Sequence, residues 1–120
     1  MSNNKNPKYD LEERTLEFAK QIRFFIKKLP KSVANFEDGK QVIRSSGSVG
    51  ANYIEANESL SRKDFLMRAK ISRKEAKETR YWLQLINTKD DIELEKERNN
   101  LSEEATELIK ILSSIIEKSK

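Results

Sequence analysis

Apolar side chains recur along most of the chain at alternating steps of three and four residues, the spacing that gathers them on one face of an α-helix. The first set is Leu11, Thr15, Phe18, Ile22, Phe25 and Leu29, widened by Ala19 and Ile26. Asp10 and Glu13 resemble a capping box, and Pro30 disfavours helical geometry in the residue before it. The pattern therefore predicts a helix over residues 10–29, preceded by a flexible polar tail over residues 1–9.

Residues 44–57 contain two glycines and three serines, which suggests a loop because a glycine costs a helix about 1 kcal/mol relative to alanine. The helical spacing nevertheless continues through this stretch, so we expect a helix over residues 36–60 with Asn35 as its N-cap. Its small residues should let a neighbouring backbone approach closely. The face that we place toward the core comprises Phe36, Ile43, Gly47, Gly50, Ile54 and Asn57.

Two further helices follow from the same spacing, over residues 62–87 and 94–118, and Ser61 with Asp64 gives a cap signal for the first of them. Their core seams are Phe65, Ala69, Ser72, Ala76, Thr79, Leu83 and Ile86, and then Leu101, Ala105, Leu108, Leu112 and Ile115. Four helices joined by short loops predict an all-α fold, an antiparallel up-down-up-down four-helix bundle over residues 10–118.

A second apolar stripe lies beside the predicted seam on two of the helices. Its members are Val42, Val49, Tyr53, Ala56 and Leu60 on one helix, and Ile71, Trp82 and Leu85 on the next. A large side chain such as Trp82 outside the seam needs cover, which a partner subunit provides. We therefore expect these residues to form a subunit interface in a homo-oligomer. A wide helix–helix contact inside one monomer is the alternative.

The amino-acid composition limits the kinds of site that the protein can contain. The 120 residues suit one domain with one core, and 36% apolar with 37% charged residues is typical of solvated amphipathic helices. The chain has no cysteine and no histidine, which excludes a thiolate metal site and removes the commonest general base. No apolar run reaches the roughly 20 residues of a membrane span, and the start MSNNKNPKY has no hydrophobic signal region. A cytoplasmic protein without membrane association or cofactor is expected.

The net charge of +4 is unevenly distributed, because residues 62–88 carry eight basic and three acidic side chains. A basic stripe comprises Lys70, Arg73, Lys77 and Arg80, with Lys63 and Lys74 nearby and Arg44 on the outward side of the preceding helix. These side chains can neutralise phosphates without reading bases, which predicts binding to RNA or DNA. A solvated face paired with Glu75 and Glu78, or with acids of the last helix, is the alternative. No aromatic residue is interleaved with this stripe, so stacking on single-stranded bases is not expected.

One segment carries a recognisable motif. Ser48-Val-Gly-Ala-Asn-Tyr-Ile-Glu-Ala56, preceded by Gln41-x-x-Arg44, resembles the S-[IV]-x-A-N-x-x-E-[GA] signature of the four-helix-bundle proteins encoded in intervening sequences of bacterial 23S ribosomal RNA genes, the S23-like family. The polar positions of this motif are Ser48, Asn52 and Glu55. The similarity continues through Ser61-Arg-Lys-Asp-Phe65 and Lys74-Glu-Ala-Lys-Glu-Thr-Arg-Tyr-Trp-Leu83, whereas Ala56 stands where many members have glycine.

The resemblance implies a homopentameric ring, which is what a heterologous interface forms when its rotation closes. A related bundle, the accessory variability protein of diversity-generating retroelements, is also a basic pentamer that binds nucleic acid and works with a reverse transcriptase. By this similarity we expect an oligomeric scaffold that binds RNA or DNA and accompanies a nucleic-acid enzyme. A protein–protein interaction scaffold with no nucleic-acid role is the alternative.

Catalysis is not expected. A ferritin-like carboxylate metal site needs Glu-x-x-His motifs, and the chain has no histidine. Glu55 and Glu58 are predicted away from the core, and Ser48 has no histidine to act as its base. The sequence therefore predicts neither a catalytic nor a metal-binding residue.

Overall fold

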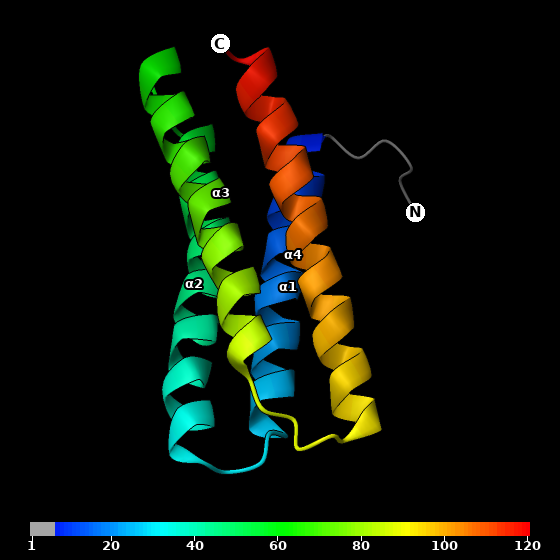
Figure 1. Cartoon of the computed structure of the whole chain (residues 1–120). Helices are drawn as coiled ribbons and strands as arrows, with labels where there is room; N and C mark the ends of the chain where they lie inside the picture. Colours follow the sequence, from blue (N-terminus) through cyan, green and yellow to red (C-terminus); the bar gives the residue numbers. More distant parts are fainter. Residues whose placement is uncertain (1–6) are drawn as a thin grey trace.

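The computed structural model describes the backbone from residue 7 onward and side chains from residue 11 onward, and this part of the chain is four helices with short connections (Figure 1). The helices are α1 (Pro7–Lys27), α2 (Val33–Asn57), α3 (Arg62–Leu85) and α4 (Ile92–Lys118). Each runs antiparallel to the next (Figure 1). The predicted all-helical four-helix bundle is confirmed, and residues 7–120 contain no strand.

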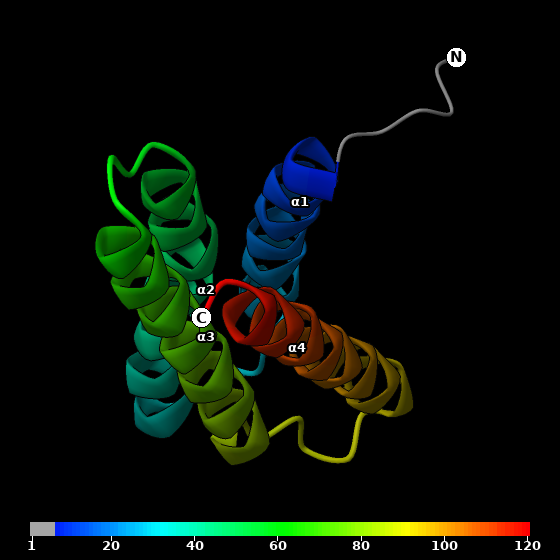
Figure 2. The same cartoon turned by 90° about the horizontal axis from the view of Figure 1, so that it is seen from above.

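Each helix packs on two of the others. α2 lies against α1 and α3, and α4 lies against α3 and α1, while the backbones of the diagonal pairs stay apart over the described residues. Viewed from the end, α2 and α3 stand side by side and α1 and α4 complete the bundle (Figure 2). This arrangement leaves every helix with one outer face.

Serine side chains set the starts of two helices. Ser32 Oγ accepts a hydrogen bond from the Asn35 amide at 3.0 Å, and Ser61 Oγ accepts one from the Asp64 amide at 3.1 Å. A capping oxygen of this kind satisfies an amide that a helix start leaves without a partner. The predicted cap signal at Ser61 is confirmed. The predicted cap at Asn35 is wrong, because Ser32 performs that role and α2 begins three residues before residue 36.

The predicted N-terminal tail is partly wrong. Helix α1 begins at Pro7, so residues 7–9 are helical, and residues 1–6 lie outside the described part of the chain. Proline suits a first helical position because an amide there would have no partner within the helix. Asp10 therefore lies inside α1 and does not cap it.

Four of the other boundaries shift by two or three residues, whereas the start of α3 at residue 62 and the end of α4 at residue 118 agree with the prediction. α1, α2 and α3 end before the predicted residues 29, 60 and 87, and α4 begins at Ile92 instead of residue 94. The early start of α4 follows from Asp91, whose carboxylate accepts a hydrogen bond from the Leu94 amide at 3.0 Å. Spacing of apolar residues locates a helix better than it locates the helix ends.

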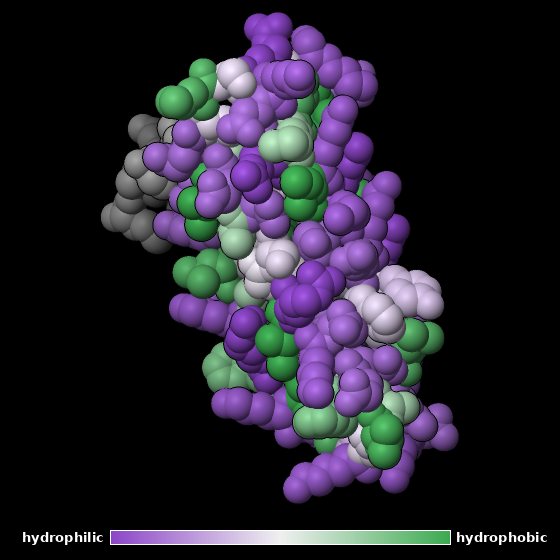
Figure 3. Space-filling model, turned by 90° about the vertical axis from the view of Figure 1, so that its left-hand side faces the viewer, coloured by the Kyte–Doolittle hydropathy of each residue, from purple (hydrophilic) through white to green (hydrophobic). Residues whose placement is uncertain are grey.

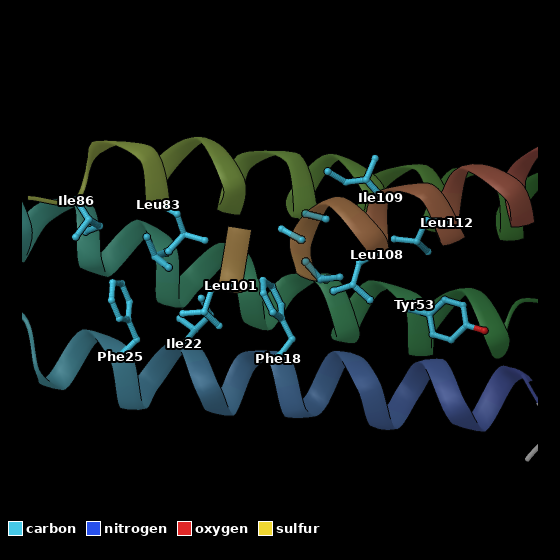
Figure 4. Close-up of a cluster of buried hydrophobic side chains, with 14 of the residues drawn as sticks. Phe18, Ile22, Phe25, Tyr53, Leu83, Ile86, Leu101, Leu108, Ile109 and Leu112 are labelled. Atoms are coloured by element: carbon cyan, nitrogen blue, oxygen red, sulfur yellow. The ribbon is translucent and has the colours of Figure 1, made fainter. Parts of the chain in front are cut away.

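The seams predicted for α1, α3 and α4 form most of the core (Figure 4). Their buried members are Leu11, Thr15, Phe18, Ile22, Phe25, Ala69, Ser72, Ala76, Thr79, Leu83, Ile86, Leu101, Ala105, Leu108 and Leu112. Leu29, Phe65 and Ile115, which were predicted in these seams, are half-buried, whereas Ile116 is buried. These seams are thus confirmed apart from three positions at their margins.

The prediction for α2 assigned its two apolar faces the wrong way round. Phe36 and Ile54, predicted in the core, are 63% and 48% exposed. Four residues predicted at a subunit interface are instead buried within one copy of the bundle, each at most 3% exposed: Val42, Val49, Tyr53 and Ala56. Because a single copy already buries them, they do not meet a neighbouring subunit.

Two glycines of α2 explain this rotation. A Cβ atom at Gly50 would lie 2.8 Å from Thr15 Oγ1, and one at Gly39 would lie 3.3 Å from Ile26 Cγ2. Both contacts are with α1, so the glycine side of α2 meets α1 and its valines turn toward the bundle centre. The predicted close backbone approach is confirmed at Gly50, where the Thr15 carbonyl carbon would lie 3.8 Å from the added Cβ atom. Gly39, which the prediction did not include, meets only the Ile26 side chain. Gly47 differs, since its nearest neighbour would be Arg23 Nη2 at 3.7 Å.

Buried hydroxyl groups join α2 to α3. Ser72 Oγ donates a hydrogen bond to the Val49 carbonyl at 2.7 Å, and the hydroxyls of Thr79 and Ser45 lie 2.7 Å apart. All three hydroxyl-bearing residues are fully buried. Small side chains with internal partners allow two helices to pack closely without leaving a buried polar atom unpaired.

Candidate nucleic-acid interface

The outer face of α3 carries a row of lysines, which we call the lysine row: Lys63, Lys70, Lys74 and Lys77. Lys63, Lys70 and Lys77 are seven residues apart, which aligns them along the helix at intervals of about 10.5 Å. All four side chains are exposed. Within the described part of the chain, none of them forms an ion pair, so their charges face solvent without a bound counter-charge.

Arg73 and Arg80 lie beside the lysine row, on the side toward α4. Arg73 Nη1 donates a hydrogen bond to Ser113 Oγ at 3.2 Å, and Arg80 Nη1 donates one to Thr106 Oγ1 at 3.1 Å. Hydroxyl partners orient a guanidinium without cancelling its charge. Both arginines, half-buried between α3 and α4, therefore extend the positive surface from α3 toward α4.

Arg44 was predicted in this basic site, and the structure places it elsewhere. Arg44 belongs to α2, and its side chain reaches the side of α3 that faces α2. There Nη1 contacts Glu75 Oε1 at 3.3 Å and Nη2 contacts Glu78 Oε2 at 2.9 Å. Two carboxylates already neutralise its charge. Arg44 is therefore a cross-helix ion-pair residue and has no free donor charge for a phosphate.

The pKa values of the two carboxyl groups shift in opposite directions. Burial, with the adjacent Glu78 carboxylate, raises the pKa of Glu75, which is 8% exposed. Hydrogen bonding with Glu75 and with Arg44 lowers the pKa of Glu78. The hydrogen bond with Glu78 in turn raises the pKa of Arg44. The ion pair thus combines one buried and one half-exposed acid around a single guanidinium.

An aromatic side chain belongs to the same outer face. Tyr81 is 59% exposed and follows Lys77 by four residues and Lys74 by seven, so it continues the lysine row. Its ring meets the ring of Trp82 edge to face, with centroids 5.2 Å apart and planes at 74°. The predicted stripe has no interleaved aromatic residue, but Tyr81 directly follows its last member, Arg80, and lies in line with Lys74 and Lys77 on the helix surface. An aromatic ring is therefore present at the end of the stripe, which the prediction against base stacking did not include.

The motif residues lie away from the lysine row, on α2. Asn52 Nδ2 donates a hydrogen bond to the Ser48 carbonyl at 2.9 Å, so this pair is internal to the helix. Both residues are half-buried, and Glu55 is exposed. The remaining predicted interface residues differ in exposure: Leu60 is fully exposed, Leu85 is 46% exposed, and Ile71 and Trp82 are half-buried. For these four, a subunit interface stays a prediction.

An apolar surface lies at the junction of α1 and α2, where the chain forms an open groove of about 690 Å³. Its apolar lining comprises Ile26, Leu29, Pro30, Val33, Phe36 and Ile43, and Lys27, Lys31 and Lys40 stand around it. Val33 is 83% exposed. On the α2–α3 side of the bundle, by contrast, hydrophilic side chains cover most of the surface and separate the apolar ones (Figure 3).

The described residues contain no group of three or more acidic side chains placed to bind a metal ion. Over the same residues, the helices are too polar or too short in their apolar stretches to cross a membrane. The chemically distinctive features of the described chain are therefore the lysine row with Tyr81, the Arg44 ion pair and the apolar groove.

Comparison with known proteins places this bundle in a family. The model of the 23S rRNA-intervening sequence protein family matches residues 8–114. The chain belongs to this family. The resemblance noted at Ser48, Asn52 and Glu55 is thereby confirmed. No curated protein matches this intervening-sequence protein.

A solved structure resembles this intervening-sequence protein over nearly its whole length. It is the crystal structure of a protein of unknown function from the S23 ribosomal protein family of Bacteroides thetaiotaomicron VPI-5482. The two share 35% sequence identity with a TM-score of 0.79, and the alignment covers 92% of this chain and 97% of the other. The four-helix architecture is therefore shared between the two proteins.

Proposed function

We propose that this intervening-sequence protein is a non-catalytic scaffold that assembles into a homopentameric ring and binds RNA or DNA through the outer face of α3. The observation that carries the nucleic-acid part is the lysine row, four exposed cations that have no ion-pair partner within the described chain. Arg73 and Arg80 add charge on the α4 side. Such a surface suits the phosphate backbone, which it can contact without reading sequence.

The structure supports separate roles for the cations of α2 and α3. Glu75 and Glu78 of α3 pair with Arg44 on the side facing α2, and the lysine row occupies the outermost side. Lys74 also interacts electrostatically with both acids, so the uncompensated positive potential of the outer face lies mainly at Lys63, Lys70 and Lys77. In a ring the same face recurs in every copy, so a modest row becomes an extended positive surface.

Assembly is supported by two complementary patches, one at the α1–α2 connection and one at the start of α4, segments that lie at the same end of the bundle (Figure 1). One is the apolar groove between α1 and α2, with Lys27, Lys31 and Lys40 around it. The other is Ile92, which is 80% exposed and follows Asp90 and Asp91. We place Ile92 of one copy in the groove of the next, where the acids would face the lysines. Two different patches make a head-to-tail contact, the type that generates rings.

A protein–protein scaffold with no nucleic-acid role is the second candidate, and the apolar groove is the observation in its favour. In that case a partner protein would occupy the groove or the lysine row. By similarity to the retroelement accessory protein, the proposed partner is a nucleic-acid enzyme such as a reverse transcriptase. Whether the lysine row is required for RNA or DNA binding separates the two candidates.

The test is binding of fluorescein-labelled RNA and DNA, measured by anisotropy at several salt concentrations. The variant K63E/K70E/K74E/K77E should lose binding, and single Lys→Ala changes should each reduce the slope of log K against log salt by about 0.7–0.9. The matched control is K20E/K96E/K110E/K118E, which changes four exposed lysines away from both α3 and the apolar groove. Equal loss in both quadruple variants, or unchanged binding in the first, would overturn the proposed interface.

A further inference from the structure

We infer that the outer face of α3 binds single-stranded nucleic acid, with a base stacked on Tyr81 and the flanking phosphates at Lys77 and Lys74. This inference rests on the proposed nucleic-acid role and specifies its substrate class. It starts from the exposure of Tyr81, whose side chain is 59% exposed on the outermost side of α3, opposite the buried seam.

The contact with Trp82 prepares the Tyr81 ring for stacking. Two rings at 74° meet edge to face, so Trp82 leaves at least one face of the tyrosine ring uncovered. Trp82 is itself half-buried and packs against the hydrophobic core. A ring whose position is restricted in this way loses less conformational entropy on binding than a freely rotating one.

The lysines lie at suitable positions along the same helix. Lys77 is one turn from Tyr81, a rise of about 6 Å, and Lys74 is two turns away, a rise of about 10.5 Å. A flexible single strand can place one base on the ring while its neighbouring phosphates reach these ammonium groups. Every base has an aromatic face, so this mode tolerates any sequence.

The same geometry disfavours a duplex at Tyr81. Bases in a double helix are stacked on one another and present only their edges, so a ring on a convex helix surface has no base face to meet. A duplex would contact the lysine row by charge alone. The two kinds of nucleic acid should therefore differ in their dependence on Tyr81 and agree in their dependence on the lysines.

Acids near this site do not oppose the placement. Glu75 and Glu78 are the acidic side chains of α3 nearest to Lys74 and Lys77 in sequence, and both pair with Arg44 on the α2 side. Asp64 lies 13 residues before Lys77, about 20 Å along α3, and its backbone amide donates to the capping Ser61 Oγ. A phosphate at Lys77 would thus approach a surface whose nearest acids pair with Arg44.

The experiment compares Y81A, Y81F and the parent protein on labelled single strands and on duplexes of equal length, again by anisotropy. Y81A should weaken single-strand binding by about 5- to 150-fold, the loss expected for one stacked base, and should leave duplex binding unchanged. Y81F should bind like the parent protein. For Y81A, the slope of log K against log salt should equal that of the parent protein, because no phosphate contact is removed.

A matched control and an internal reporter strengthen the test. F24A removes an aromatic side chain of similar exposure, 55%, on α1, and it should not change binding. Trp82 is the only tryptophan in the chain, so its fluorescence should change when a single strand binds and remain constant with a duplex. Circular dichroism of each variant confirms that the bundle remains folded.

The outcomes separate the inference from the function on which it rests. If the lysine variants lose binding while Y81A keeps full single-strand affinity, the stacking inference is overturned and the proposed function stands. Equal loss of single-strand and duplex binding in Y81A also overturns stacking. If Y81A instead reduces the oligomer mass, Tyr81 is a subunit contact and the inference fails. A parent protein that binds neither nucleic acid overturns both.

Discussion

Asn35 and Asn87 join the two loops at one end of the bundle through a reciprocal pair of hydrogen bonds. Asn35 Nδ2 donates to the Asn87 carbonyl at 2.8 Å, and the Asn87 amide donates to Asn35 Oδ1 at 2.9 Å. Asn35 Nδ2 also donates to the Pro30 carbonyl at 3.0 Å. A single buried amide therefore connects the α1–α2 loop with the end of α3, and this role replaces the N-cap predicted for it.

Replacing Asn35 with alanine should lower the free energy of unfolding by about 2–4 kcal/mol, because three hydrogen bonds are lost and buried backbone groups remain unpaired. Asn35→Asp should cost at least as much at neutral pH, because its carboxylate keeps the acceptor for the Asn87 amide but sets an oxygen, in place of the donor, against the Asn87 and Pro30 carbonyls. Urea unfolding followed by circular dichroism measures both. The control is Asn99→Ala, an exposed position on α4 that should change stability by less than about 0.5 kcal/mol. Equal effects at residues 35 and 99 would contradict the structural role of Asn35.

How much the sequence predicts depends on how many apolar stripes a helix carries. Helix α1 has one continuous stripe, and the apolar residues outside it, such as Leu16 and Phe24, are isolated, so the burial of Phe18 and Ile22 follows from spacing alone. Helix α2 has two adjacent stripes of similar apolar character. The contact of Gly50 with Thr15 selects one of them for burial, and that contact exists only after the helices pack.

The candidate site was predictable in the same partial way. The lysine row follows from the spacing on α3, and so does Tyr81, because Lys70, Lys74, Lys77 and Tyr81 lie at i, i+4, i+7 and i+11. The arginines at i+3 and i+10, Arg73 and Arg80, lie on an adjacent line of the helix surface, and the predicted stripe that included them did not contain Tyr81. Pairing with Glu75 and Glu78 was the alternative drawn from the sequence, and it holds for Arg44; spacing alone does not single out Arg44, since the contact joins residues 31 and 34 positions apart across two helices.

The glycines of α2 should respond differently to alanine. Gly50→Ala places a Cβ atom 2.8 Å from Thr15 Oγ1 and 3.2 Å from Thr15 Cβ, and we expect a loss of about 1–3 kcal/mol despite the better helix propensity of alanine. Gly47→Ala meets only the far end of Arg23, at 3.7 Å, so it should stabilise α2 by up to about 1 kcal/mol. Thermal and urea unfolding of the two variants provide the comparison.

The double variant T15A/G50A identifies the cause. Removing the Thr15 hydroxyl relieves the shortest contact, so Gly50→Ala should cost less in a Thr15→Ala background than alone. If the two substitutions are additive, steric crowding between α1 and α2 is not the reason for glycine at position 50.

The Arg44 ion pair should make stability depend on pH. The raised pKa of Glu75 means that the folded state binds more protons than the unfolded state above pH 4.5, so stability falls as the pH rises through the folded pKa. Arg44 opposes this by lowering the pKa of Glu75. The lowered pKa of Glu78 has the opposite sign, since its stabilisation is lost as the pH falls below 4.5 through the folded pKa.

Arg44→Ala should therefore cost about 1 kcal/mol at neutral pH, a modest value for a half-exposed pair, and the cost should shrink toward zero in acid as both carboxylates protonate. Urea unfolding between pH 3 and 8 measures this difference. Glu75→Gln is the control, because it removes the buried carboxylate and should flatten the decline at higher pH. An Arg44→Ala penalty that stays constant across this range would show that its lost packing, and not the ion pair, is responsible.

Ring assembly predicts a charge-swap result at the two complementary patches. Lys31 stands at the apolar groove and Glu93 follows Ile92, and both are exposed within one copy. If Ile92 of one copy docks in the groove of the next, Lys31→Glu and Glu93→Lys should each place like charges across the contact and reduce assembly. Light scattering coupled to size-exclusion chromatography should then show a smaller mass for each single variant than for the parent protein.

The double variant K31E/E93K restores opposite charges with their positions exchanged, so it should recover the parent mass, five times that of one chain. Phe36→Asp, in the same groove, should prevent assembly because it removes an apolar contact. Adding Glu93→Lys to Phe36→Asp should not restore the parent mass, since a new charge pair does not replace that contact. Recovery in the double variant is decisive because damage to the fold of a single copy would accumulate when two substitutions are combined, whereas a contact between copies is repaired. A parent protein that elutes as a monomer at all concentrations would refute the ring, and additive losses would place the subunit contact elsewhere, with Leu60 and Leu85 as the next exposed candidates.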